Sequence, residues 1–236
     1  MLRSAYRSFA QGVLTPELIR KEHRSWERAR PPNERAVEYG FALNQLARLV
    51  PRTVLDVGPG ESSWPDLLAT AGFRVRAIDL VEGYWSGGYF NPHWRVRQDD
   101  ITAPTTAERF GAVTCLSVLE HIPDHLAAVR GMASLLEPGG HVILTCPYNE
   151  NHYESNVYAL PGARRGATAN YVCQMFSRDE LESWLTTGLD LVDKQLWQAW
   201  TGATWASGEE VSPLQRDGEP HQLACFLLRS RRAESG

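Results

Sequence analysis

The 236-residue chain has little of what marks disulfide-rich, zinc-binding or membrane proteins. Its four cysteines lie far apart with no C-x-x-C pair, so neither a zinc site nor a disulfide framework is indicated. No apolar run approaches the ~18 residues of a membrane helix, and the N-terminal MLRSAYRSFAQG lacks the apolar core of a signal peptide. We therefore expect a cytoplasmic protein with no membrane insertion and with reduced, mostly buried thiols.

The chain also lacks an excess of positive charge, since its formal net charge is -4. Its most basic stretch, RKEHRSWERAR, interleaves acids and is typical of the solvated face of a helix. Nucleic-acid-binding proteins usually carry a basic patch, so we expect no nucleic-acid partner. Hydrophobic residues make up 43% and charged residues 22%, which are ordinary values for a globular domain.

What the sequence does contain is an apolar segment, TVLDVGPGESSW at 53–64, that ends in an acid and then in glycines. A strand that leads into a glycine loop and a helix brings bare backbone N–H groups up to a ligand; here the loop is Gly58, Pro59 and Gly60. The acid Asp56 argues against a dinucleotide, because a carboxylate would repel phosphate. It suits a ligand with an ammonium or sulfonium charge.

Four further segments have the pattern of strands and end in polar residues: 73–80, 94–101, 112–124 and 139–149. The second strand ends in Asp79, which lies 21 residues after Gly58, close to the ~20 expected between a glycine loop and an acid that binds a ribose diol. In an open parallel sheet these strand ends share one edge. The ligand crevice lies at that edge.

Five segments resemble, in order, the motifs of class I S-adenosylmethionine-dependent methyltransferases: VLDVGPG, AIDL, QDDI, SVLEHIPD and LLEPGGHVILTCPYN. The resemblance covers roughly residues 35–230 and departs at Ser62, where many members have a further glycine. It implies an α/β fold, a Rossmann-like, seven-stranded, mostly parallel sheet flanked by helices, with an N-terminal helical cap. Residues 1–50 should form helices of the same domain and residues 51–231 the methyltransferase domain.

The resemblance also implies the cofactor, S-adenosylmethionine, and its site. Asp79 is expected to bond the ribose hydroxyls, Asp100 and Ile101 the adenine, and Asp56 to act on the methionine end through the loop. Arg35 and Tyr39, from the helix expected at 33–50, would face the same end. The predicted cofactor site consists of Asp56, Gly58, Pro59, Gly60, Asp79, Leu80, Asp100, Ile101, Leu116 and Ser117.

The implied reaction is in-line displacement at a methyl carbon, so the protein must align the acceptor and, for a hydroxyl acceptor, remove its proton. His121 is the predicted base because it follows the fourth strand and histidine titrates near neutral pH. Alternatively, it is a structural histidine that braces the turn into the next helix. His121 and His125 are four residues apart, but Pro123 starts a helix between them, so we predict no metal. The predicted acceptor-binding residues are Glu120, Tyr148 and His152.

Three stretches are longer than such a sheet needs: 81–94, 148–176 and 200–220. The first is expected to cover the adenosine, the second to bind the acceptor, and the third to be a loop between the last two strands. We predict methyl transfer to a small molecule or a sugar-containing biosynthetic intermediate, at oxygen. The alternatives are a methyltransferase acting on protein or RNA, a catalytically silent cofactor-binding subunit, and a nucleotide-dependent oxidoreductase, which Asp56 disfavours. The oligomeric state is left open.

Overall fold

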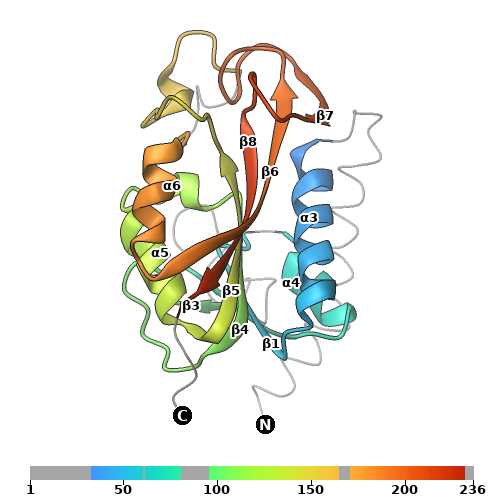
Figure 1. Ribbon diagram of the computed structural model, residues 1–236, viewed down its shortest axis with the longest axis vertical. Coiled ribbons are helices and arrows are strands. Elements are labelled where there is room, and N and C mark those ends of the chain that lie inside the picture. Colours follow the sequence, from blue (N-terminus) through green and yellow to red (C-terminus); the bar gives the residue numbers. More distant parts are fainter. Residues whose placement is uncertain (1–32, 61, 81–95, 165–170, 232–236) are drawn as a thin grey trace.

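The computed structural model describes residues 33–60, 62–80, 96–164 and 171–231, which form one eight-stranded sheet with helices on both faces (Figure 1). The strand order is β3-β2-β1-β4-β5-β8-β6-β7. Pairing is parallel from β3 to β5 and antiparallel from β5 to β7. Residues 1–32 of the expected N-terminal helices and the stretch 81–94 lie outside the described residues.

The strands are β1 (Thr53–Val57), β2 (Arg74–Asp79), β3 (Val96–Gln98), β4 (Phe110–Leu116), β5 (Leu136–Pro147), β6 (Leu189–Trp200), β7 (Glu210–Gln215) and β8 (Leu223–Ser230). The α-helices are α3 (Glu34–Leu49), α4 (Trp64–Thr70), α5 (His125–Ser134) and α6 (Arg178–Leu185). Two short 3-10 helices are η3 (Leu119–His121) and η4 (Val157–Ala159). No helix in these described ranges is long and apolar enough to cross a membrane.

The expected Rossmann-like, mostly parallel arrangement is confirmed, but the predicted count of seven strands is wrong by one. The additional strand, β7, comes from the stretch 200–220, which was expected to be a loop, and it pairs antiparallel with β6 at the edge of the sheet. Its sequence, EVSPLQ, contains Pro213. Because proline argues against a strand except at a sheet edge, the sequence hides this element.

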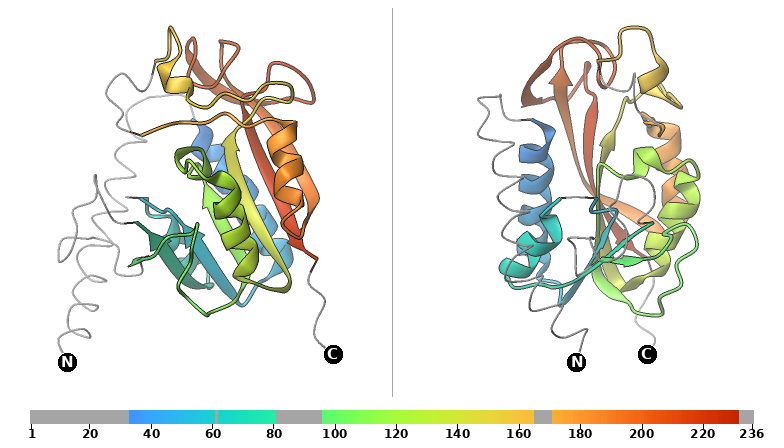
Figure 2. Two further views of the ribbon diagram at one scale, coloured as in Figure 1. Left: turned by 90° about the vertical axis from the view of Figure 1, so that its left-hand side faces the viewer. Right: turned by 180° about the vertical axis from the view of Figure 1, so that it is seen from behind.

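Two apolar cores pack on the two faces of the sheet. Figure 2 shows α5 and α6 on one face and α3 and α4 on the other. Successive residues of β5 alternate between them: Leu144 and Cys146 join the core under α5 and α6, whereas Ile143 joins the core under α3 and α4. The helix expected at 33–50 is confirmed as α3, and its Val37 and Phe41 are buried against the sheet. This packing fixes α3 against the sheet.

A tight turn after β3 is set by α5. The backbone and hydroxyl of Thr102 both donate to Oδ1 of Asp100, each at 2.8 Å. The backbone of this turn also contacts α5 directly. A Cβ on Gly131 of α5 would lie 1.8 Å from the carbonyl oxygen of Ile101. Only a glycine leaves room for the turn, so α5 determines where Asp100 and Ile101 lie.

The central strand β1 carries a carboxyl group in the interior. Asp56 is 2% exposed, and its Oδ1 accepts a hydrogen bond of 2.7 Å from the Thr114 hydroxyl of β4. Trp64 of α4 donates to the same hydroxyl oxygen over 3.3 Å. Oδ2 of Asp56 has no hydrogen-bond partner within the described part of the chain. Burial raises the pKa of Asp56 to about 8.

Gly131→Ala should lower the free energy of unfolding by about 1–3 kcal/mol, because its methyl group collides with a backbone carbonyl that cannot move freely. Gly40→Ala in α3 is the matched control, since nothing lies within 4 Å of its Cβ position. This control should gain roughly 0.5–1 kcal/mol from helix propensity. Chemical denaturation of both variants checks the pair, and equal effects would contradict the close approach.

The burial of Asp56 should make stability depend on pH. Between its ordinary pKa of 3.8 and about 8, the folded state keeps a proton that the unfolded state has lost. The contribution of Asp56 to the free energy of unfolding therefore falls as pH rises through this window. Asp56→Asn removes that contribution, so denaturation at about pH 5 and about pH 8 should give a flatter dependence than in the native protein. Parallel curves for the two proteins would contradict it.

Candidate active site

The carboxyl ends of β1 and β2 bring the glycine loop and the predicted ribose acid together. The N–H of Gly58 donates to Ile78 over 2.9 Å, and the N–H of Gly60 donates to Oδ2 of Asp79 over 3.1 Å. Gly58 has a φ of 68°, and a Cβ there would lie 2.3 Å from Cγ1 of Val118. The loop thus needs glycine both for its backbone conformation and for its contact with the segment after β4.

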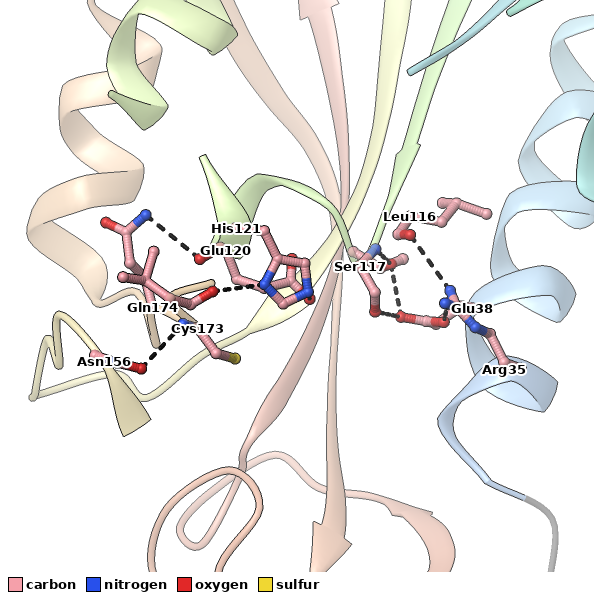
Figure 3. A network of polar contacts seen from close by, with 11 residues as sticks. Arg35, Glu38, Leu116, Ser117, Glu120, His121, Asn156, Cys173 and Gln174 are labelled. Atoms are coloured by element: carbon pink, nitrogen blue, oxygen red, sulfur yellow. Dashed lines mark hydrogen bonds and ion pairs between the residues drawn. The ribbon is translucent and has the colours of Figure 1, made fainter. Parts of the chain in front are cut away.

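The end of β4 is tied to α3 through a buried acid, Glu38, which the sequence analysis did not single out. Glu38 is fully buried and accepts hydrogen bonds from the hydroxyl of Ser117 and, at 2.9 Å, from that of Thr145 in β5. Ser117 follows β4 with a left-handed φ of 51°, and its N–H donates to the Thr145 carbonyl over 3.0 Å. Figure 3 shows this cluster. In the sequence, the only indication of this cluster was an acidic residue on the apolar face of the helix that forms α3.

Arg35 completes the cluster. Its guanidinium lies 2.9 Å from Oε2 of Glu38 and 3.3 Å from the carbonyl oxygen of Leu116. Burial acts to lower the pKa of Arg35, but the neighbouring acidic groups, Glu38 foremost among them, together outweigh it and hold the pKa above its ordinary value. Arg35 therefore stays a cation at the end of β4.

Glu120 and His121 lie in η3, just beyond this cluster (Figure 3). Glu120 is 2% exposed, its Oε2 has no hydrogen-bond partner among the described residues, and burial raises its pKa to about 8. Nδ1 of His121 is 2.7 Å from the carbonyl oxygen of Val172. A carbonyl only accepts, so we assign the proton of the neutral ring to Nδ1, which leaves a lone pair on Nε2. Nε2 lies 3.9 Å from Oε1 of Glu120, and burial lowers the pKa of His121.

The other predicted acceptor residues do not join this site. Tyr148 is fully buried in the core under α5 and α6, and its hydroxyl donates to Glu150 over 2.9 Å. Side chains at the end of β5 keep alternating, so Tyr148 faces the opposite side of the sheet from Thr145. A role of Tyr148 in binding the acceptor stays a prediction. The His152 side chain is 62% exposed and lies 4.0 Å from Glu154. It makes no hydrogen bond or ion pair with His121 among the described residues.

Among the remaining predicted cofactor residues, Leu80 is exposed, Ile101 is buried and Pro59 is buried in the glycine loop. Burial raises the pKa of Asp56 to about 8, which favours its neutral form and weakens a direct attraction to a sulfonium. The role of Asp56 at the methionine end stays a prediction, and the structure shows its carboxyl group bonded to Thr114.

The residues at this edge fit S-adenosylmethionine chemically. A narrow glycine loop stands beside a carboxylate suited to a diol, and Arg35 is a cation suited to a carboxylate group. Two buried carboxyl oxygens, Oδ2 of Asp56 and Oε2 of Glu120, lack partners in the described part of the chain. Buried polar atoms without partners are costly, and they commonly occur where a ligand binds.

Comparisons with known proteins agree with a site for S-adenosylmethionine. A sequence profile for a methyltransferase domain matches residues 20–194. The ubiquinone biosynthesis O-methyltransferase of Xanthomonas axonopodis pv. citri is 33% identical over 196 residues, which cover 71% of this chain and 77% of that protein. The enzyme of the same name from Coxiella burnetii (strain RSA 493 / Nine Mile phase I) is 28% identical over 198 residues, 78% of this chain and 80% of the relative.

Solved structures share the fold. The 1,6-didemethyltoxoflavin-N1-methyltransferase of Burkholderia thailandensis, with bound S-adenosylhomocysteine, superposes with a TM-score of 0.56 at 19% identity, covering 97% of this chain and 87% of that one. An S-adenosylmethionine-dependent methyltransferase from Clostridium acetobutylicum gives 0.53 at 12% identity, covering 82% and 90%. Together with the profile match over most of the sequence, these findings show that the chain belongs to the class I methyltransferase family and is an enzyme that uses S-adenosylmethionine.

Proposed function

We propose that this enzyme transfers the methyl group of S-adenosylmethionine to a hydroxyl oxygen of a small molecule. The observation that carries the proposal is the hydrogen bond from Nδ1 of His121 to the Val172 carbonyl, which leaves Nε2 able to accept a proton. The two sequence relatives described above are named ubiquinone biosynthesis O-methyltransferases, which supports oxygen as the accepting atom. A sugar-containing acceptor stays a prediction from the sequence.

The chain would hold the cofactor at the carboxyl ends of β1, β2 and β4. Asp79 would accept hydrogen bonds from the ribose hydroxyls, the turn at Asp100 and Ile101 would bind the adenine, and Arg35 would face the methionine end. The bound cofactor supplies a methyl group on a sulfonium, which already has a good leaving group. The remaining work of the protein is to orient the acceptor and to take its proton.

His121 is suited to that proton transfer. Burial lowers the pKa of His121 and so favours the neutral ring, whose Nε2 can accept the hydroxyl proton as the oxygen attacks the methyl carbon. Glu120 is largely protonated at neutral pH, so it does not draw a proton onto His121 beforehand. The ring of Tyr171 packs edge-on against the imidazole of His121, with 4.8 Å between the ring centroids. Tyr171 is 48% exposed, so it offers a methyl acceptor an apolar surface beside the base.

Asp79→Ala should leave the protein folded and weaken binding of S-adenosylhomocysteine by about tenfold to over a hundredfold, the range that ~1.5–3 kcal/mol for hydrogen bonds to a charged group implies. Titration calorimetry measures this. The control is Asp190→Ala in β6, which removes a surface ion pair with Arg231 and should not change the affinity. Unchanged affinity in Asp79→Ala would contradict the ribose assignment.

His121→Ala should lower turnover by ~10²–10⁴ while affinity for S-adenosylhomocysteine stays nearly constant, because a general base acts only in the transition state. Turnover is followed as release of S-adenosylhomocysteine with a panel of hydroxyl-bearing small molecules. The loss should shrink at high pH, where the hydroxyl ionises without help. His141→Ala, a half-buried histidine within β5, is the control.

Two outcomes would refute the proposed function. A loss of less than about tenfold in His121→Ala, with folding intact and acceptor saturating, would remove His121 as the base. Methylation at nitrogen or carbon in the product would remove oxygen as the acceptor atom.

A further inference from the structure

The segment 171–176 lies across η3 and holds it from one side (Figure 3). The backbone N–H of Gln174 donates to the carbonyl of Glu120 over 2.9 Å, and its side-chain Nε2 donates to the carbonyl of Ile122 over 2.8 Å. One glutamine thus binds the residues immediately before and after His121. Two residues earlier in the same segment, Val172 accepts the bond from Nδ1 of His121.

The orientation of the Gln174 amide follows from its partners. Its Oε1 accepts from the hydroxyl of Tyr153 over 2.8 Å, and its Nε2 faces a carbonyl, which can only accept. The side chain is 2% exposed, so these bonds do not compete with water. The segment that carries Gln174 therefore bonds η3 twice, at the His121 side chain through Val172 and at the backbone of Glu120 through Gln174.

We propose that Gln174 is a positioning residue for His121, which it holds in the tautomer with a free Nε2 by fixing the Val172 carbonyl at Nδ1. An unconstrained neutral imidazole populates both tautomers, and the one with a proton on Nε2 cannot accept a proton there. The inference rests on the proposed function for its catalytic consequence. The geometric claim can be tested without activity.

The same contacts give the stretch after β5 a second role. Residues 171–176 end the stretch 148–176, which was expected to bind the acceptor, and they set the state of the base. Tyr153, which bonds Gln174, belongs to the same stretch. Base and acceptor-binding segment are thus one hydrogen-bonded unit.

The direct test is nitrogen NMR of the protein with labelled histidine, in the absence of acceptor. The signal of His121 among the seven histidines is identified by its loss in His121→Ala. The native protein should show a proton on Nδ1 of His121, and Gln174→Met should show both tautomers. Gln222→Met is the matched control. Gln222 is also a buried glutamine whose side-chain amide donates to backbone carbonyls, those of Trp200 and Gly202. This change should leave the His121 signal unchanged.

Kinetics separate this inference from the proposed function. Gln174→Met should lower turnover by about 10–100-fold, the scale of a misplaced catalytic group, with unchanged affinity for S-adenosylhomocysteine. The same change added to His121→Ala should cost nothing further. If His121→Ala itself retains turnover, the proposed function fails. The tautomer measured by NMR still tests the positioning role of Gln174 in that case.

An unchanged tautomer in a folded Gln174→Met protein would overturn the inference, and so would an equal further loss in the His121→Ala background. If Gln174→Met does not fold, Gln174→Glu gives the same readout. Ionised glutamate keeps an acceptor for Tyr153 and replaces the donor to Ile122 with an oxygen that cannot donate.

Discussion

The arrangement of this molecule depends on one buried charge, the carboxylate of Glu38. A charge taken out of water is very costly unless it is paired and hydrogen-bonded. Glu38 meets that demand with Arg35 from its own helix, Ser117 from the end of β4 and Thr145 from β5. The helix α3 therefore cannot slide along the sheet without taking Glu38 away from the hydroxyls of Ser117 and Thr145. These bonds hold one end of the active site in place.

Two buried carboxyl oxygens that lack hydrogen-bond partners in the described residues lie where the strand order of the sheet reverses direction. β1 and β4 are neighbours in the sheet, and the chain winds outward from them in opposite directions, to β2 and to β5. Open α/β sheets bind ligands at such a point. Asp56 lies on β1 and Glu120 follows β4, and each has a buried carboxyl oxygen without a partner in the described residues. These two groups lie in the place where a ligand can satisfy them.

The sequence predicted what depends on local pattern. Strand ends, the glycine loop and the pairing of that loop with Asp79 follow from apolar periodicity and a fixed spacing, and the structure bears them out. The roles of Glu38 and Gln174 depend on partners far away in the chain, so no local pattern marks them. The side of the sheet that Tyr148 faces also could not be predicted, because a residue at a strand end can face either side. β7 was missed because Pro213 interrupts its pattern.

Pro213 also has a consequence for the molecule as a whole. β7 is the last strand of the sheet, and the unpaired groups of an edge strand are a template for strand addition by another molecule. Proline has no N–H to offer, and β7 is only six residues long. A short edge that lacks a donor is a poor template. This end of the sheet is thereby protected from edge-to-edge aggregation at high protein concentration.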